Sequence, residues 1–206
     1  MTDLRPIVVI AAASSGSTAL TGFLHRCGAY TCPPHQSTND ERTPSAYEPY
    51  RYAAALRTLF DERTLKQTGE IEHFRNFFEI FWEEEVGKAR AQGFETIVLK
   101  HPLHTLILPY LHRRIDPKFI LVTRPLREIE NTRLRRQWHP VHGEWGAKQI
   151  YSVAMNFLIE YSCPCLSVPY NAMLHSREMR DTLVRYCGLS PGSDRMKKAE
   201  GFLSIR

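Results

Sequence analysis

The chain has 206 residues, of which 43% are hydrophobic and 24% are charged, and its formal net charge is +5 at pH 7. This length and composition exclude a disordered chain and predict a single domain, residues 1–206, with one sizeable core. The moderate positive charge favours an anionic ligand, but it does not by itself indicate binding to nucleic acid.

The cysteines are odd in number and lack the C-x-x-C spacing that is typical of zinc ribbons and redox sites. They are Cys27, Cys32, Cys163, Cys165 and Cys187. Reduced, mostly buried thiols in a cytoplasmic protein are therefore the favoured interpretation.

Two interpretations compete for the opening stretch "VVIAAASSGSTALTGFL", residues 8–24. An apolar run after Arg5, followed by "AAAS", resembles a secretion signal with a cleavage site. Against that interpretation, Asp3 offsets the charge of Arg5, and "SSGST" is too polar for the core of a signal. No other segment approaches the ~18 apolar residues that a membrane span needs.

The favoured interpretation is a buried strand over residues 6–11, a tight loop of small residues, and a helix over residues 16–27 that ends at Gly28. Residues 31–49 are rich in Pro, Ser, Thr and Asn, which predicts a loop that covers or lines a site before a further helix begins.

Strands and helices alternate along the remaining chain. Further strands are predicted at residues 96–99, 118–123 and 166–168, and further helices at residues 70–92, 103–115, 126–138 and 147–161, with a last one ending at Cys187. This alternation predicts an α/β fold of the three-layer, P-loop type, with a parallel sheet of about four to five strands flanked by helices.

The loop "SSGST", residues 14–18, has the composition of a phosphate cradle. Its backbone N–H groups and the positive end of the following helix can face one anion, and Gly16 allows close approach. Compared with the pattern G-x-x-x-x-G-K-[ST], the loop has Ser17 in place of the lysine. An ATP enzyme of the usual Mg²⁺-dependent design is therefore disfavoured, while an ordinary strand-to-helix turn remains the structural alternative.

A second candidate anion site lies in "KFILVTRPLREIENTRLRR", residues 118–136. Arg124 ends a buried strand, so its guanidinium is expected in the crevice at the carboxyl edge of the sheet. Thr132 follows two helical turns later and can add a hydroxyl to the same anion. Arg133, Arg135 and Arg136 are interpreted as a solvated face of the helix.

Together, strand–"SGST"–helix and strand–"RP"-x-x-E-x-x-x-"T" resemble the sulfotransferase family that uses 3'-phosphoadenosine 5'-phosphosulfate. That family has a loop similar to P-K-S-G-T-T for the 5'-phosphosulfate and an R-P-x-x-D/E pattern for the 3'-phosphate. The resemblance implies that the following residues bind this co-substrate: Ser14, Ser15, Gly16, Ser17, Thr18, Arg124 and Thr132.

Other segments support the resemblance in the same chain order. "YEPYRY" is similar to F-E-P-L of carbohydrate sulfotransferases, "VLKHPLHTLILP" to K-T-H-L-P, and "VPYNAML" with "LVRYCGLS" to R-Y-E-D-L and F-L-G-L. The chain departs from the family at Ser14, where a basic residue is expected. Lys100, His101 and Arg127 are the candidates to replace that cation. "SDRMKKAEGFLSIR" also lacks the complete basic glycine loop of the family.

Sulfuryl transfer implies catalysis without a metal, together with a general base for the acceptor hydroxyl. Glu48, on the loop before a helix, and His101, after the second long strand, are the two candidate bases, and Lys100 is a candidate catalytic cation. The structural alternatives are a helix N-terminal carboxylate for Glu48 and a packing residue for His101.

The acceptor class stays open among carbohydrates, phenols, lipids and peptides. His104, His139 and His142 are expected on the surface or lining a pocket, and Trp138 and Trp145 either stack on an acceptor or are buried. Two rival functions remain: a P-loop kinase with a degenerate lysine, and a non-catalytic basic module that binds nucleotide or nucleic acid through residues 124–136.

Overall fold

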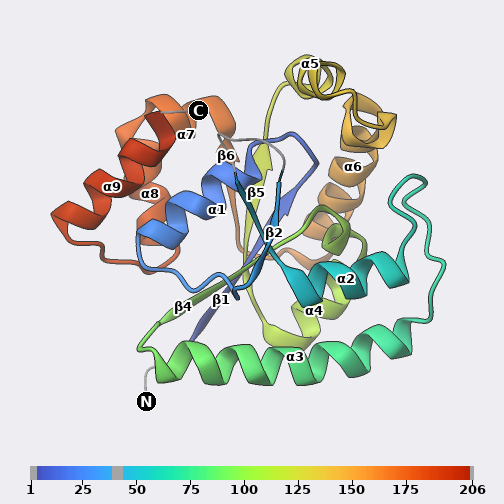
Figure 1. The fold of residues 1–206 in the computed structure, drawn as a ribbon, viewed down its shortest axis with the longest axis horizontal. Helices are drawn as coiled ribbons and strands as arrows, with labels where there is room; N and C mark the ends of the chain where they lie inside the picture. The colour runs from blue at the N-terminus through green and yellow to red at the C-terminus, as the bar shows by residue number, and fades with distance from the viewer. Residues whose placement is uncertain (1–3, 39–43, 205–206) are drawn as a thin grey trace.

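Four parallel strands form the central sheet of the computed structural model, which describes residues 4–38 and 44–204 (Figure 1). They are ordered β4 (Thr96–Lys100), β1 (Arg5–Ala11), β5 (Lys118–Thr123) and β6 (Cys165–Pro169). Tyr30 adds a one-residue parallel bridge to Ile97 outside β4. The predicted α/β fold with a parallel sheet flanked by helices is therefore confirmed.

Helices cover both faces of this sheet because successive strand residues point to opposite sides. Val8 and Ile10 face one apolar layer, whereas Ile7 and Val9 face the other. The first layer is built on α2 (Tyr50–Leu59), α3 (Ile71–Ala91), α4 (Leu108–Ile115) and α6 (Glu144–Tyr161). The second is built on α1 (Ser17–Arg26), α7 (Tyr170–His175), α8 (Arg177–Tyr186) and α9 (Ser193–Ser204).

Helix α5 (Leu126–Arg136) stands at one end of the molecule (Figure 1), where Ile129 packs against Ala147 and Ile150 of α6. Two short 3-10 helices, η1 (Pro102–Ile107) and η2 (Pro140–His142), lie close to the carboxyl edge of the sheet. They connect β4 to α4 and α5 to α6, so both border the predicted site.

The predicted loop over residues 31–49 was wrong in part. It contains an antiparallel pair of strands, β2 (His35–Ser37) and β3 (Ser45–Pro49), while residues 39–43 lie outside the described residues. Ala46 and Tyr47 of β3 are buried, although the abundant Pro, Ser and Thr of the segment are typical of an exposed loop. Glu48 accordingly lies in a strand and not in a loop.

Two helical predictions also needed correction. The segment at residues 103–115 divides into η1 and α4, and the last predicted helix divides into α7 and α8. Ser176 starts α8, because its hydroxyl accepts a hydrogen bond from the N–H of Met179 at 3.2 Å. The C-terminal basic segment forms α9, which buries Ala199 and Phe202 in the layer of α1.

The five cysteines are free thiols, and Cys27, Cys32 and Cys187 are buried. Within residues 4–38 and 44–204, no helix has the length and apolarity that a membrane crossing requires.

Candidate functional site

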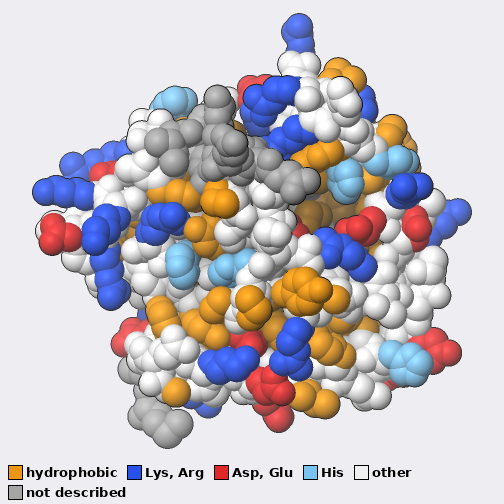
Figure 2. Space-filling view, viewed as in Figure 1, with side chains coloured by type: hydrophobic (Ala, Val, Ile, Leu, Met, Phe, Trp, Pro, Cys, Tyr) orange, Lys and Arg blue, Asp and Glu red, His pale blue; other side chains and the backbone are white. Residues whose placement is uncertain are grey.

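Most of the predicted site residues lie at or just after the carboxyl ends of parallel strands, and these ends meet at one edge of the sheet. The loop of residues 12–16 follows β1, His101 follows β4, Arg124 follows β5, and Tyr170 follows β6. Figure 2 shows a hollow in this face of the molecule, with histidine, acidic and basic side chains on its rim. The fold therefore gathers most of the predicted residues at one edge of the sheet.

The loop after β1 has the backbone geometry that its sequence predicts. Gly16 is the N-cap of α1 with φ of 96°, and Ser14 is also left-handed, with φ of 62°. A Cβ atom on Gly16 would lie 2.1 Å from the Tyr170 ring, so only glycine fits under this ring. Within the described residues, the N–H groups of Ser17 and Thr18 donate no hydrogen bond and stay available to an anion.

Lys100 brings a buried cation to this loop. Its Nζ donates to Thr18 Oγ1 at 3.2 Å, to the carbonyl oxygen of Ala46 at 3.0 Å, and to Glu48 Oε1 at 2.6 Å. Only 3% of the Lys100 side chain is exposed. Of the three candidates to replace the basic residue missing at Ser14, Lys100 is therefore the one that contacts the loop.

Arg127 lies on α5 and is exposed. Within the described part of the chain, no hydrogen bond or ion pair joins it to the loop after β1. Its role as the replacement cation stays a prediction.

Glu48 is the charge partner of Lys100. Burial raises the pKa of this carboxyl, but the nearby Lys100 and His101 outweigh burial and lower the pKa to about 2. Because this value lies below the ordinary 4.5, the pair stabilises the fold above that pH and the contribution is lost as the pH falls toward 2. The Glu48 side chain is 14% exposed.

His101 lies beside this ion pair. Its Nδ1 accepts a hydrogen bond from the N–H of Leu103 at 3.1 Å and so caps η1. Its Nε2 lies 3.7 Å from Glu48 Oε2 and makes no hydrogen bond in the described structure. Burial lowers the pKa of His101 to about 4, even though Glu48 acts in the opposite direction.

Arg124 and Thr132 meet as predicted. Arg124 Nη1 donates to Thr132 Oγ1 at 3.2 Å and to the carbonyl oxygen of Ser14 at 3.1 Å, while its Nε donates to Glu128 Oε2 at 3.0 Å. Its guanidinium carbon lies 4.9 Å from the centre of the Tyr170 ring. The second predicted anion site is thus joined directly to the loop after β1.

Three residues at the site were missed by sequence reasoning, and a fourth, His142, was expected only on the surface or lining a pocket. Tyr170 lies within the recognised "VPYNAML" segment and Glu128 within the recognised R-P-x-x-E pattern, so the sequence pointed to both positions. Tyr151 lies in the middle of α6, beside Ser15 and Arg124, and had none. The carbonyl oxygen of His142 accepts a hydrogen bond from Ser14 Oγ at 3.2 Å, a contact across 128 positions.

Several peripheral expectations changed. His104 is fully buried, not on the surface, and its Nε2 lies 2.9 Å from the carbonyl oxygen of Val9. His139 is exposed, as expected. For Trp138 and Trp145, burial was favoured over stacking on an acceptor. Both are exposed instead, Trp138 by 38% and Trp145 by 48%. They lie at the end of α5 and the start of α6, where no further layer covers them.

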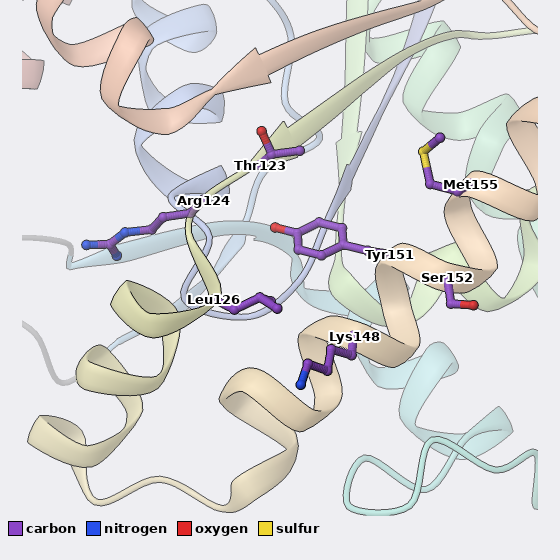
Figure 3. A pocket seen from close by; sticks show the side chains of 7 residues that line it. All are labelled: Thr123, Arg124, Leu126, Lys148, Tyr151, Ser152 and Met155. Carbon is purple, nitrogen blue, oxygen red and sulfur yellow. The ribbon is translucent and has the colours of Figure 1, made fainter.

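A cavity of about 440 Å³ adjoins the site between β5, α5 and α6 (Figure 3). Figure 3 shows the Tyr151 ring pointing from α6 toward the end of β5, whereas the Arg124 side chain points away from the cavity. The Tyr151 hydroxyl donates to the carbonyl oxygen of Val122 at 3.0 Å. Lys148 at its edge is paired with Glu144, so the cavity offers few free polar groups.

The burial of His104 predicts a specific loss of stability in acid. Burial lowers its pKa from 6.5 to about 3, so the unfolded chain binds a proton that the folded chain rejects. Stability should fall as the pH drops below 6.5, by about 1.4 kcal/mol per pH unit for this group. In urea unfolding at pH 7, 6 and 5, His104→Gln should make the free energy of unfolding less dependent on pH. The expected decrease in slope corresponds to the uptake of about one proton on unfolding. Its amide can still donate to Val9, and an unchanged slope would contradict this assignment.

No protein-family model matches this chain, and a search of curated proteins finds no match. The case for a function therefore depends on the residues at the carboxyl edge of the sheet.

Proposed function

We propose that this protein is a sulfotransferase that moves the sulfuryl group of 3'-phosphoadenosine 5'-phosphosulfate to a hydroxyl acceptor. The observation that carries the proposal is the pair of contacts made by Arg124 Nη1, to Thr132 Oγ1 and to the Ser14 carbonyl oxygen. They place Arg124 and Thr132, the second predicted anion site, directly beside the loop after β1, the first predicted anion site. A nucleotide bearing a 3'-phosphate needs both sites at once.

The phosphate loop supports the 5' end of this assignment. Free N–H groups at the start of α1, the hydroxyl of Ser17, and Ser15 beside them can surround an anion. Lys100 places a positive charge beside the loop, because its Nζ donates a hydrogen bond to Thr18 Oγ1. This arrangement compensates for the missing basic residue at Ser14, the main departure from the sulfotransferase pattern.

Glu48 is the better of the two candidate bases. His101 Nδ1 is occupied by the N–H of Leu103, so a neutral His101 carries its proton on Nε2 and has no free lone pair facing the crevice. Glu48 Oε2 is a charged acceptor beside Lys100. As the new S–O bond forms, the acceptor hydroxyl becomes more acidic, and its proton can pass to this carboxylate.

Thermal unfolding with nucleotides tests the proposal. A ligand present at ~100 times its Kd should stabilise the fold by about 2.7 kcal/mol. We expect a higher Tm with 3'-phosphoadenosine 5'-phosphate, without metal, and a smaller response to ADP or to ATP with Mg²⁺. A larger response to ATP with Mg²⁺ would favour a kinase. Binding of nucleic acid that weakens steeply with salt, with no nucleotide response, would favour a basic binding module.

A further inference from the structure

One face of α5 is exposed to solvent and combines apolar with basic side chains. Arg127, Asn131, Leu134 and Trp138 recur at helical spacing, which places them along one side of α5 and its C-terminal turn. Arg135 is the exposed neighbour of Leu134. We call these five residues the α5 surface. Figure 2 shows basic and hydrophobic side chains mixed at the end of the molecule where Figure 1 places α5.

The turn that ends α5 fixes the position of Trp138. The N–H of Trp138 donates to the carbonyl oxygen of Arg133 at 3.1 Å, and the N–H of Gln137 donates to that of Leu134 at 3.1 Å. The Arg136 guanidinium carbon lies 4.6 Å from the centre of the Trp138 ring. Leu134 is nevertheless 56% exposed and Trp138 38% exposed, so both apolar side chains stay in contact with water.

The charge of the α5 surface is positive. Both glutamates of α5 form ion pairs with arginines outside this surface, Glu128 with Arg124 and Glu130 with Arg133. Arg127 and Arg135 form no ion pair within residues 4–38 and 44–204. An anionic partner would therefore complement the charge of these two exposed arginines.

The apolar residues decide which anionic partner fits. A nucleic acid would use the arginines, but its sugar-phosphate backbone is polar and gains little from Leu134. A second copy of the chain, packed face to face about a two-fold axis, would bring the arginines of both copies together. An anionic bilayer satisfies both parts of the surface, because its headgroups attract arginine and its interface accepts leucine and tryptophan.

We infer that the α5 surface docks on an anionic lipid bilayer, with Leu134 and Trp138 in the interface and Arg127 and Arg135 against the headgroups. Helix α5 has 11 residues, so it lies along the bilayer surface. The inference goes beyond the proposed function and does not depend on it, since it concerns binding alone.

The α5 surface adjoins the candidate site. The ring centres of Trp138 and His142 are 5.7 Å apart, and the carbonyl oxygen of His142 accepts the hydrogen bond from Ser14 Oγ. A bilayer docked on the α5 surface therefore lies at the same end of the molecule as the loop after β1.

Co-sedimentation of the intact protein with vesicles tests the inference. We expect binding to phosphatidylcholine vesicles that contain about 30% phosphatidylserine, and little binding to phosphatidylcholine alone. The bound fraction should fall as NaCl rises from about 50 mM to about 500 mM. Failure to bind the anionic vesicles at the lower salt concentration would overturn the inference.

Tryptophan fluorescence shows whether Trp138 enters the interface. The chain has three tryptophans, and Trp82 is buried. In a Trp145→Phe variant, Trp138 is therefore the exposed tryptophan that reports the contact. Its emission should shift to shorter wavelength on anionic vesicles and should be quenched by brominated acyl chains. Vesicle binding without this shift would contradict docking through the α5 surface.

Two variants of the α5 surface measure its apolar and charged contributions. Leu134→Asn should weaken vesicle binding about 10-fold, and Arg135→Ala should weaken it roughly five-fold. The matched controls are Ile80→Asn and Arg90→Ala, on α3 at the opposite end of the molecule in Figure 1. Ile80 is 59% exposed, and both controls should bind as the wild-type protein does. The Tm of each variant checks that its fold is intact.

The remaining outcomes identify a different partner. Equal losses in the α3 controls and the α5 variants would overturn docking through this surface. Tight binding of an oligonucleotide that Leu134→Asn leaves unchanged, without vesicle binding, would favour nucleic acid. A concentration-dependent dimer that Leu134→Asn disrupts, again without vesicle binding, would favour a second copy of the chain.

Discussion

An Arg124→Ala variant is expected to bind 3'-phosphoadenosine 5'-phosphate about 1.5 to 3 kcal/mol more weakly than the wild-type protein, roughly 10- to 150-fold in Kd. The guanidinium is held by Ser14, Thr132 and Glu128. Its Nη2 donates no hydrogen bond to the described residues and can turn to a phosphate. Isothermal titration calorimetry would measure the change.

A nucleotide without the 3'-phosphate separates a direct contact from a general disturbance. Adenosine 5'-phosphate should bind equally to the wild-type protein and to Arg124→Ala, because the lost interaction is with the 3' group. Arg135→Ala is the matched control, since Arg135 is an exposed arginine on α5, the helix that follows Arg124. Equal weakening of both nucleotides by Arg124→Ala would place Arg124 outside the 3'-phosphate site.

A Glu48→Gln variant is expected to lose transfer by roughly 100- to 10,000-fold while it still binds 3'-phosphoadenosine 5'-phosphate. The amide cannot accept the acceptor proton as the carboxylate does. The free energy of unfolding should also fall by about 3 kcal/mol, because Lys100 keeps its charge without a charged partner in a buried position. Urea unfolding and single-turnover sulfate release would measure the two effects separately.

The double variant Glu48→Gln/Lys100→Met tests whether the unpaired charge of Lys100 causes the loss of stability, and whether transfer returns when stability does. Removing the orphaned charge should restore much of the free energy of unfolding, since a buried apolar side chain replaces an unpaired cation. Transfer should stay low. Recovery of transfer along with stability would mean that Glu48 acts through the fold and not as the proton acceptor.

The strands and helices were largely predictable because their signals are local. The β-branched run of β1 and "KFILVT" of β5 are buried on both faces, and each leads into a loop and a helix. Such alternation determines a parallel sheet, and a parallel sheet gathers the residues after its strands at one edge. Arg124 and Thr132, eight positions apart, could be paired from helical spacing alone.

The hydrophobic pattern of the sequence did not predict elements whose burial depends on residues far along the chain. β3 was missed because its buried residues, Ala46 and Tyr47, stand among polar residues and are covered only when α1 and β4 are in place. The helix α9 was missed for a similar reason, since its buried Phe202 packs in the layer of α1, far along the chain.

What the sequence by itself determined is the α/β alternation, the small-residue loop and the arginine at a strand end, because each depends on neighbours within a few residues. Only the tertiary structure decided that Lys100 reaches Thr18 across 82 positions and pairs with Glu48. It also decided that the Tyr170 ring packs against Gly16 and that the N–H of Leu103 donates to Nδ1 of His101, which leaves the proton of a neutral ring on Nε2. These contacts arise from side-chain packing across the sheet edge, which no local periodicity encodes.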